Sequence, residues 1–333
     1  MPLPGLEYQD GERFLLLIGA LVLDALFGEF GLLFRFVPHP VAALGRVIAW
    51  AETRLNRPER PARTRMQRGA LTLVLLTAAA AGLGWSIAFV AGVLRFGEII
   101  EVFVVAVLLA QRSLFEHVRA VAAALADEGL SAGRTMVARI VGRDVGALDA
   151  HGVARATIES LAENFSDAVV APALWYLFLG LPGIMAYKCV NTLDSMVGHR
   201  TPRYRAFGAP AAHADTALNF VPARLSALLL AAAALFVPNG RPLRALRVVL
   251  RDAGRHRSRN AGWPEAAMAG AIGVALAGPR SYGGEAVKDA WLGEEFTARA
   301  LPPDIHRALA IYAIACLLLL ALASLGLGVA LVM

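Results

Sequence analysis

Three long runs of this chain carry no charged side chain, and they restrict its fold more than any other feature. The runs are 69–94, 168–187 and 308–333. A helix needs about 20 mostly apolar residues to cross roughly 30 Å of hydrocarbon, and each run meets that length. The chain is 57% hydrophobic, whereas a soluble domain is typically about 45–50% apolar. The sequence therefore predicts an all-α, polytopic helical membrane protein.

The segment 14–34 is predicted to be a retained first span rather than a cleaved signal. The charges before it are acidic, at Glu7, Asp10 and Glu12, and no obvious small-residue cleavage site is present. The segment also contains Asp24 and Glu29, two acids that are costly to expose to lipid.

Other apolar segments are imperfect as spans. Pro182 and Gly183 interrupt the run 168–187, and the runs 99–110 and 225–238 are short. Irregular backbone at membrane depth is tolerated where it lines a cavity. We expect the segments around Pro182 and Leu225 to be broken or re-entrant. In total, about four to six membrane helices are predicted, together with cytoplasmic helical segments.

The arginines indicate the orientation of the chain. Residues 35–68 hold eight arginines against two glutamates, and residues 241–259 hold seven against one aspartate. Such clusters are typical of the cytoplasmic side, and the mixed segment 111–167 is assigned there too. The chain has a net charge of +6, and its basic residues cluster beside the apolar runs. This placement favours anionic lipid over nucleic acid as a partner. We predict one domain, 1–333, multi-pass in the cell (inner) membrane, with a cytoplasmic active face.

Several common kinds of site are absent from the sequence. Neither a GxxxxGK[ST] loop nor a GxSxG elbow occurs. Cys189 and Cys316 show no CxxC or Cys/His spacing, so neither a disulfide framework nor a zinc site is supported. The glycine-rich stretch GPRSYGGE, 278–285, is not a phosphate loop either. Any use of ATP would proceed without a recognisable P-loop.

The stretch ARATIESLAENFSDA, 154–168, is the most informative polar segment. Its charged residues follow each other at steps of four: Arg155, Glu159, Glu163 and Asp167. On an α-helix they would form one slowly drifting stripe, bordered by Ser160 and Asn164. The alternative is a solvated helix face, but buried charge is costly at the mouth of an apolar run. Because Mg²⁺ prefers oxygen ligands and often bridges to phosphate, the stripe predicts a magnesium or phosphate–metal site.

Two further segments place amides and acids in helical phase. Asn191, Asp194 and Ser195 stand at i, i+3 and i+4, and Asp215 and Asn219 at i and i+4. A capping or turn role is the alternative for each of these residues taken singly. Pro222 is predicted to break the helix, and Arg224 to meet an anionic group.

The remaining polar residues have simpler explanations. His39 lies between two prolines, which indicates a rigid turn more than a substrate contact. In 251–270, most arginines are explained as membrane-surface charges, whereas His256, Asn260 and Glu265 are less easily dismissed. Asn260 is predicted to lie in a turn before a helix that begins near Pro264.

Taken in order, these segments resemble the cobalamin-biosynthesis family of adenosylcobinamide-phosphate synthases (CobD/CbiB, cobinamide synthase). The matching pieces are PHPVAALGR, IVGRDVGALD, IESLAENFSDAVVAPALWY, NTLDSMVGHRTPRYRAFG, DTALNFVPAR, and RNAGWPEAAMAGAIGVALAG with SYGG, which cover most of 38–284. The resemblance implies a membrane enzyme that joins (R)-1-aminopropan-2-ol, or its O-phosphate, to the propionate carboxylate of adenosylcobyric acid. It also implies amide formation driven by ATP, with Mg²⁺.

The chain departs from the family pattern in three places. Gly28-Glu29-Phe30 stands where the family tends to show Gly-Asp-Pro, and Asp215-Thr216 stands for an Asp-Asp pair. The third departure is an arginine, Arg259, in place of the proline of an SPNAG piece. The second departure puts in doubt any role that needs two adjacent acids.

From the residues and the resemblance together, we assign a provisional site. The predicted catalytic residues are Glu159, Glu163, Asn164, Asp167, Asn191 and Asp194. The predicted substrate-binding residues are His39, Arg143, Arg155, Ser195, Asp215, Asn219, Arg224 and Asn260. The predicted Mg²⁺ ligands are Glu163, Asp167 and Asp194. Expected partners are adenosylcobyric acid, aminopropanol or its phosphate, the lipid membrane and other corrin-pathway membrane enzymes, but no nucleic acid.

Two other classes of function remain open from the residues alone. One is a Mg²⁺-dependent membrane transferase of the prenyl or CDP-alcohol type, although the denser DxxxD pairs usual there are lacking. The other is a transporter, in which broken helices and intramembrane acids bind ions. A transporter would scatter polar residues through its spans, whereas here they cluster at one level between spans.

Overall fold

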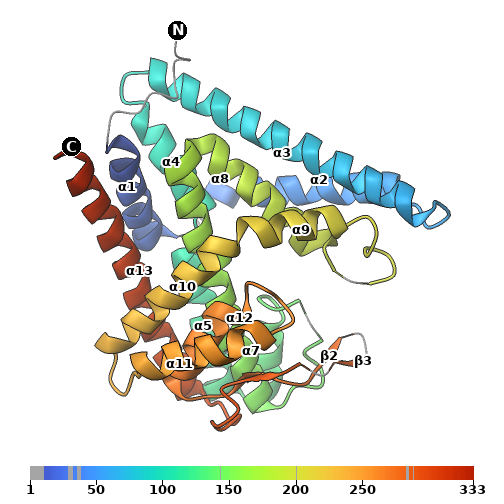
Figure 1. The fold of residues 1–333 in the computed structure, drawn as a ribbon, viewed down its shortest axis with the longest axis vertical. Coiled ribbons are helices and arrows are strands. Elements are labelled where there is room, and N and C mark those ends of the chain that lie inside the picture. Colours follow the sequence, from blue (N-terminus) through green and yellow to red (C-terminus); the bar gives the residue numbers. More distant parts are fainter. Residues whose placement is uncertain are drawn as a thin grey trace. The chain divides into compact units, whose positions relative to one another are not determined.

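The computed structural model describes residues 11–28, 33–35, 39–142, 144–199, 201–282, 285–287 and 289–333. The chain is overwhelmingly helical there, and its few strands are two or three residues long, which confirms the all-α prediction (Figure 1). It forms two compact units, each assembled from separated segments. Unit 1 comprises 1–110, 171–219 and 323–333, and unit 2 comprises 111–170 and 220–322. The assignment of a single domain stays a prediction.

Unit 1 is organised around two long helices, α3 and α8, which pack against each other. Its elements are α1 (Glu12–Phe27), η1 (Leu33–Arg35), α2 (Pro40–Leu55), α3 (Ala62–Val93), α4 (Glu98–Leu108), α8 (Ala171–Val197), α9 (Ala209–Leu218) and the end of α13. Buried Ile48 on α2, Leu193 on α8 and Ala211 on α9 meet in one apolar cluster. This cluster fixes the polar ends of α8 and α9 beside each other.

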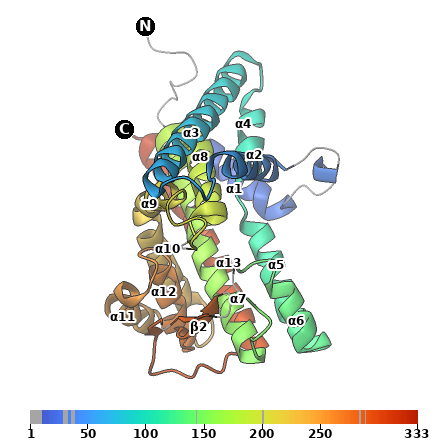
Figure 2. The ribbon, with the colours of Figure 1, turned by 90° about the vertical axis from the view of Figure 1, so that its right-hand side faces the viewer.

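Unit 2 is organised around α12, whose residues are all buried except Trp263. Its elements are α5 (Gln111–Ala123), the π-helical turn η2 (Ala124–Glu128), α6 (Leu130–Val137), α7 (Ala150–Phe165), the π-helical turn η3 (Ser166–Val170), α10 (Phe220–Ala233), η4 (Ala234–Phe236), α11 (Pro242–Asp252), η5 (Ala253–Arg255), α12 (Gly262–Ile272), β1 (Leu276–Ala277), β2 (Arg280–Tyr282), β3 (Glu285–Val287), β4 (Trp291–Leu292) and most of α13 (Pro302–Ala330). The strands pair antiparallel as β1 with β4 and β2 with β3. Figure 2 shows α5 and α6 beside α7.

Three helical runs are long and apolar enough to cross a membrane, which confirms a helical membrane protein. They are α3, the 48-residue run of α7, η3 and α8, and α13. A fourth is added if α9 and α10, interrupted at Asn219, count as one span. In the described part of the chain the structure therefore reaches only the lower end of the predicted range.

Two predicted spans are too short as the structure has them. Helix α1 has 16 residues and ends at Phe27, before Gly28, where the backbone is left-handed (φ 66°). Helix α4 has 11 residues. At 1.5 Å per residue neither spans roughly 30 Å by itself. Asp24 is buried in the protein, and Glu29 lies outside the described residues.

The predicted breaks at the two prolines are confirmed, and each has a side chain that stabilises it. Pro182 has no N–H for the carbonyl of Phe178, and Gly180 leaves the helical conformation. The Arg13 guanidinium donates to the Phe178 and Leu177 carbonyls at 3.0 and 3.3 Å. Such side-chain donors make broken helices tolerable at membrane depth.

The second proline breaks the chain between α9 and α10. Pro222 lies in the first turn of α10 and provides no N–H for the carbonyl of Leu218. The Trp175 indole Nε1–H donates to that carbonyl at 3.3 Å. Helix α9 therefore ends at Leu218. This is three residues before Val221, where a helix broken by Pro222 alone would be expected to end.

Candidate functional site

Three of the predicted site residues meet in one hydrogen-bonded group in unit 1. The Asp215 carboxylate, on α9, accepts from Asn191 Nδ2 of α8 at 3.2 Å and from Asn219 Nδ2 at 3.0 Å. Asn219 Oδ1 accepts in turn from the Tyr187 hydroxyl at 2.9 Å. We call these four residues the amide–carboxylate cluster. It ties the polar end of α8 to α9.

The orientations in the amide–carboxylate cluster are mutually determined. Because Tyr187 donates to the oxygen of the Asn219 amide, the amide nitrogen has to face Asp215. Asn219 is 1% exposed, so its hydrogen bonds are costly to lose. Tyr187 was missed from the sequence, although it precedes Asn191 by four residues and so shares its helix face.

The neighbouring residues of the same motif pieces take local roles. Asn191, Asp194 and Ser195 all lie within α8, which confirms the helical interpretation over a turn. Asn191 joins the cluster, whereas the Ser195 hydroxyl donates to the carbonyl of Asn191 in its own helix. The hydroxyl of Thr216, which replaces the family's second acid, likewise donates to the carbonyl of Ala212.

The predicted charged stripe on α7 is interrupted before Asp167. Helix α7 ends at Phe165, and a π-helical turn follows. A π turn contains more residues than an α turn, so the regular four-residue spacing changes at Asp167. The place of Asp167 on the same stripe stays a prediction. Such turns occur frequently at functional sites, and Glu163 just before it is exposed.

Two other charged residues of α7 bind backbone in unit 2. Glu159 is buried and accepts from the Ala277 amide at 2.8 Å, where the backbone is left-handed (φ 60°). Arg155 donates to the Ala298 carbonyl and lies over the Trp291 ring. These contacts assign both side chains a part in holding β1 and β4, and their predicted catalytic and binding roles stay predictions.

Ser160 and Asn164 connect α7 to the loop that follows α6. The Ser160 hydroxyl donates to the Ile140 carbonyl at 2.6 Å. Asn164 Nδ2 donates to the Ser160 carbonyl and hydroxyl at 2.9 and 3.2 Å. Arg143, three residues beyond Ile140, lies outside the described residues.

Arg224 and Asn260 are also brought together, in unit 2. Arg224 Nη1 donates to Asn260 Oδ1 at 2.9 Å and to the Phe220 carbonyl at 2.8 Å. The guanidinium lies over the rings of Phe220 and Trp263, at 3.7 and 4.4 Å from their centroids. We call this the guanidinium clamp. Among the described residues no carboxylate pairs with Arg224, so the clamp presents a positive charge suited to an anion.

His256 and Glu265, which flank Asn260 of the guanidinium clamp along the chain, form a buried pair. Their Nε2 and Oε2 atoms lie 3.7 Å apart. His256 Nδ1 faces the backbone of Ser258, with the amide nitrogen at 3.1 Å and the carbonyl oxygen at 3.2 Å, so Nε2 is the ring nitrogen that faces Glu265. The turn predicted at Asn260 is confirmed, since the Trp263 amide donates to its carbonyl and α12 begins at Gly262.

His39 is the N-cap residue of α2, a local role that the sequence did not predict. Its Nδ1 accepts from the Val41 amide at 3.2 Å, and its ring lies against Phe34. A contact between His39 and substrate stays a prediction.

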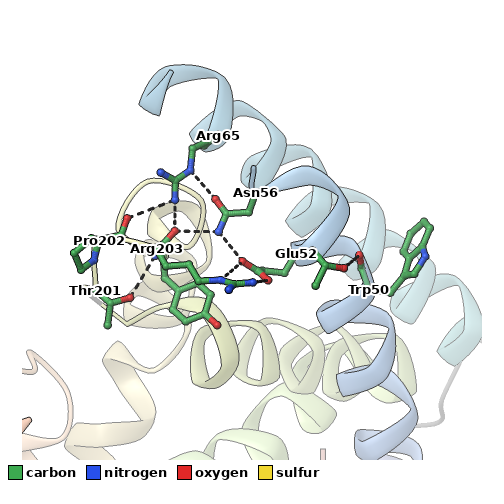
Figure 3. Close-up of polar contacts among 9 residues, drawn as sticks. Trp50, Glu52, Asn56, Arg65, Thr201, Pro202 and Arg203 are labelled. Carbon is green, nitrogen blue, oxygen red and sulfur yellow. Dashed lines mark hydrogen bonds and ion pairs between the residues drawn. The ribbon is translucent and has the colours of Figure 1, made fainter. Parts of the chain in front are cut away.

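A polar network missed by the sequence analysis holds the loop between α8 and α9 (Figure 3). Glu52, on α2, accepts from Arg203 Nε and Nη2 at 2.9 and 2.6 Å. Asn56 Nδ2 donates to Glu52 and to the Arg203 carbonyl, and Arg65 donates to Asn56 Oδ1 and to the same carbonyl. The signal available in the sequence was an acid and an amide four residues apart within an arginine-rich stretch.

The Glu52 network predicts a loss of stability in acid. The Arg203 hydrogen bonds hold the pKa of Glu52 below its usual value, against an opposing effect of burial. A lowered pKa means that the stabilisation is present above the unfolded-state pKa, near 4.5, and is lost as pH falls through the folded-state pKa. We expect Glu52→Gln to lower the thermal midpoint at pH 7 by roughly 5 °C. Below pH 4.5, the midpoint of the variant should decrease less with falling pH than that of the unchanged protein. Both quantities are measured by heating samples to a series of temperatures and determining the folded fraction by size-exclusion chromatography.

A matched control is the exposed Arg112–Glu116 pair on α5. Because exposed i,i+4 pairs contribute at most about 0.5 kcal/mol, Glu116→Gln should leave the midpoint unchanged. Equal effects of the two substitutions would contradict a special role for Glu52.

The acids of the described residues do not gather into a protein-only metal cage. Within these residues, no group of three or more His, Cys, Asp or Glu side chains is placed to hold a metal ion. Mg²⁺ usually needs only one or two carboxylates, because substrate phosphate and water complete its shell. Glu163 and Asp167, beside the π turn, suit that mode as oxygen donors. They and Asp194, in unit 1, stay predicted ligands.

Comparison with known proteins adds a direct line of evidence. The family model described as CobD/Cbib protein matches residues 17–312. A protein of Rhizobium meliloti named cobalamin biosynthesis protein CobD is 47% identical over 92% of this chain and 94% of its own length. Proteins of the same name from Brucella suis and Rhodobacter capsulatus are 49% and 44% identical, over 88% and 89% of the chain and 90% and 92% of their own lengths. No solved structure matches the chain.

Proposed function

The chain belongs to the CobD/Cbib family, and from this premise we propose that it forms an amide bond in cobalamin biosynthesis. The bond would join the propionate carboxylate of adenosylcobyric acid to the amine of (R)-1-aminopropan-2-ol or its O-phosphate. Identity of 44–49% over about nine tenths of the chain supports the role in cobalamin biosynthesis. The finer activity is supported by the amide–carboxylate cluster, in which residues of two separate motif pieces form one site.

The chemistry requires an activated acid and a deprotonated amine. A carboxylate is a poor acceptor for an amine, so its oxygen has to leave as part of a better leaving group. ATP would supply that phosphoryl group, and Mg²⁺ bound through Glu163 and Asp167 would neutralise charge on its oxygens. The ammonium group has to lose one proton before the amine can attack and a second as the amide forms, which requires a nearby base.

The residues of the chain fit separate parts of this task. The guanidinium clamp is suited to an anion, either a phosphate or a corrin side-chain carboxylate. The Asp215 carboxylate, held by two amides, is suited to accept a hydrogen bond from an ammonium or a hydroxyl. We assign Asp215, Asn191 and Asn219 to positioning aminopropanol, and Arg224 with Asn260 to the anionic group. The reaction would take place at the cytoplasmic face of the cell membrane.

A growth test separates this proposal from a transport role. Cells that lack the gene should make cobalamin when given cobinamide and should not when given cobyric acid. Membranes that contain the protein should convert adenosylcobyric acid, aminopropanol or its phosphate, and ATP into the corresponding cobinamide, detected by mass spectrometry. Rescue of the deletion strain by cobyric acid would overturn the proposal.

A further inference from the structure

Helix α11 exposes two leucines on the outer surface of unit 2. Leu243 is 78% exposed and Leu250 is 83% exposed. At a separation of seven residues they share one face of the helix. The opposite face, with Ala245, Val248 and Val249, is buried. The outward leucines therefore contribute nothing to the core of unit 2.

The same outward face is strongly basic. Arg247 and Arg251 lie on it, four residues from Leu243 and one from Leu250. Residues 241–259 contain seven arginines and a single acid, Asp252. Arg251 is paired with the fully buried Asp252 at 2.7 Å and with Glu295 at 2.6 Å, so Arg247 is the main source of positive charge on this face. The face thus combines apolar side chains with positive charge that the segment itself does not neutralise.

The start of α11 lies near the start of the last apolar helix. Burial lowers the pKa of Arg244, and repulsion from Arg241 and Arg307 lowers it further, so the three positive charges are within electrostatic reach of one another. Arg307 is the last charged residue before the uncharged run 308–333. A span of about 20 residues that ends near the C-terminal end of α13 places Arg307 close to headgroup level. The basic end of α11 is therefore at the depth where lipid phosphates are found.

We propose that α11 is an interfacial helix that lies on the anionic leaflet of the membrane that the chain itself spans. Its leucines enter the boundary between headgroups and acyl chains, and its arginines bind lipid phosphates. A basic amphipathic helix with outward apolar side chains is typical of such binding. The anionic leaflet also supplies negative charge for Arg241 and Arg244, whereas Arg307 is already paired with Asp304 at 3.3 Å. This inference does not depend on the proposed reaction.

Photo-crosslinking in intact cell membranes tests the proposal. Benzoylphenylalanine is introduced in place of Leu250, and in a matched control in place of Ser131, which is exposed on α6 of the same unit. After irradiation, the mass of the purified full-length protein should increase by one phospholipid for the probe at 250. The probe at 131 should give little such adduct. A protein adduct at 250, or equal lipid adducts at both positions, would overturn the proposal.

A charge reversal tests the part played by the arginines. With the probe at Leu250, Arg247→Glu should reduce the lipid adduct about fivefold or more in nanodiscs that contain phosphatidylglycerol. The matched substitution Arg139→Glu, at an exposed arginine after α6, should not. In nanodiscs of phosphatidylcholine alone, Arg247→Glu should have little effect. Loss of the adduct with Arg139→Glu, or no loss with Arg247→Glu, would contradict anionic lipid as the partner.

Discussion

Replacement of Arg224 by alanine is expected to reduce kcat/KM for cobinamide formation by about 100-fold or more. Arg224 is the charged centre of the guanidinium clamp, and no carboxylate of the described residues competes for it. Loss of a charge-assisted hydrogen bond to substrate typically costs about 1.5–3 kcal/mol, and loss of the bound anion's counter-charge adds to this. The measurement is product formation in membranes, with substrate concentrations varied to separate kcat from KM.

Arg224→Lys is the informative companion to this change. Lysine keeps the charge but lacks the planar group that lies between Phe220 and Trp263. We expect an intermediate loss of roughly 10-fold, mainly in KM for the substrate that carries the anion. Comparison of aminopropanol with its O-phosphate then shows which substrate that is. Normal activity of Arg224→Ala would remove the residue from the site.

Replacement of Asp215 by alanine is expected to abolish measurable activity and to lower stability as well. The amide groups of Asn191 and Asn219 would lose their shared acceptor. A buried donor left without a partner costs about 1–3 kcal/mol. We expect a lower thermal midpoint together with a loss of product, both measured on the detergent-purified protein.

Asp215→Asn separates charge from scaffolding. Asparagine keeps an oxygen that can accept from both amides, but it carries no charge. We expect a near-normal thermal midpoint and activity reduced by about 10- to 100-fold. The reason is that the variant lacks the negative charge with which Asp215 would attract the amine of the substrate. Thr216→Ala is the control, since its hydroxyl bonds to its own helix. Full activity of Asp215→Asn would limit the residue to a structural role.

The fold class was predictable because it follows from local properties of the sequence. Uncharged runs of sufficient length require helices, and prolines within them require breaks. The breaks at Pro182 and Pro222 were therefore expected, whereas their stabilising partners were not. Arg13 reaches a carbonyl 165 residues away, and no periodic pattern relates positions so far apart. The length of α1 was overestimated because hydropathy does not register the left-handed turn at Gly28.

The candidate site was predictable where spacing along one helix decides contact. The Asp215–Asn219 hydrogen bond follows from an i,i+4 spacing, and Asn191 was identified by its helical phase. The π turn at Asp167 was not expected, because the insertion of such a turn depends on packing rather than on spacing along one helix. The backbone partner of Glu159 was not expected either, because Ala277 lies more than a hundred residues away.

The interleaving of the two units has a consequence for how the protein is made. Unit 1 takes its segments from 1–110, 171–219 and 323–333, and unit 2 from 111–170 and 220–322. A ribosome therefore finishes neither unit before it has passed residue 322. No single cut between them yields two self-sufficient fragments, so exchange of segments with a relative must replace matching pieces on both sides of each boundary. Assembly in the membrane is accordingly expected to be completed only after synthesis of the last helix.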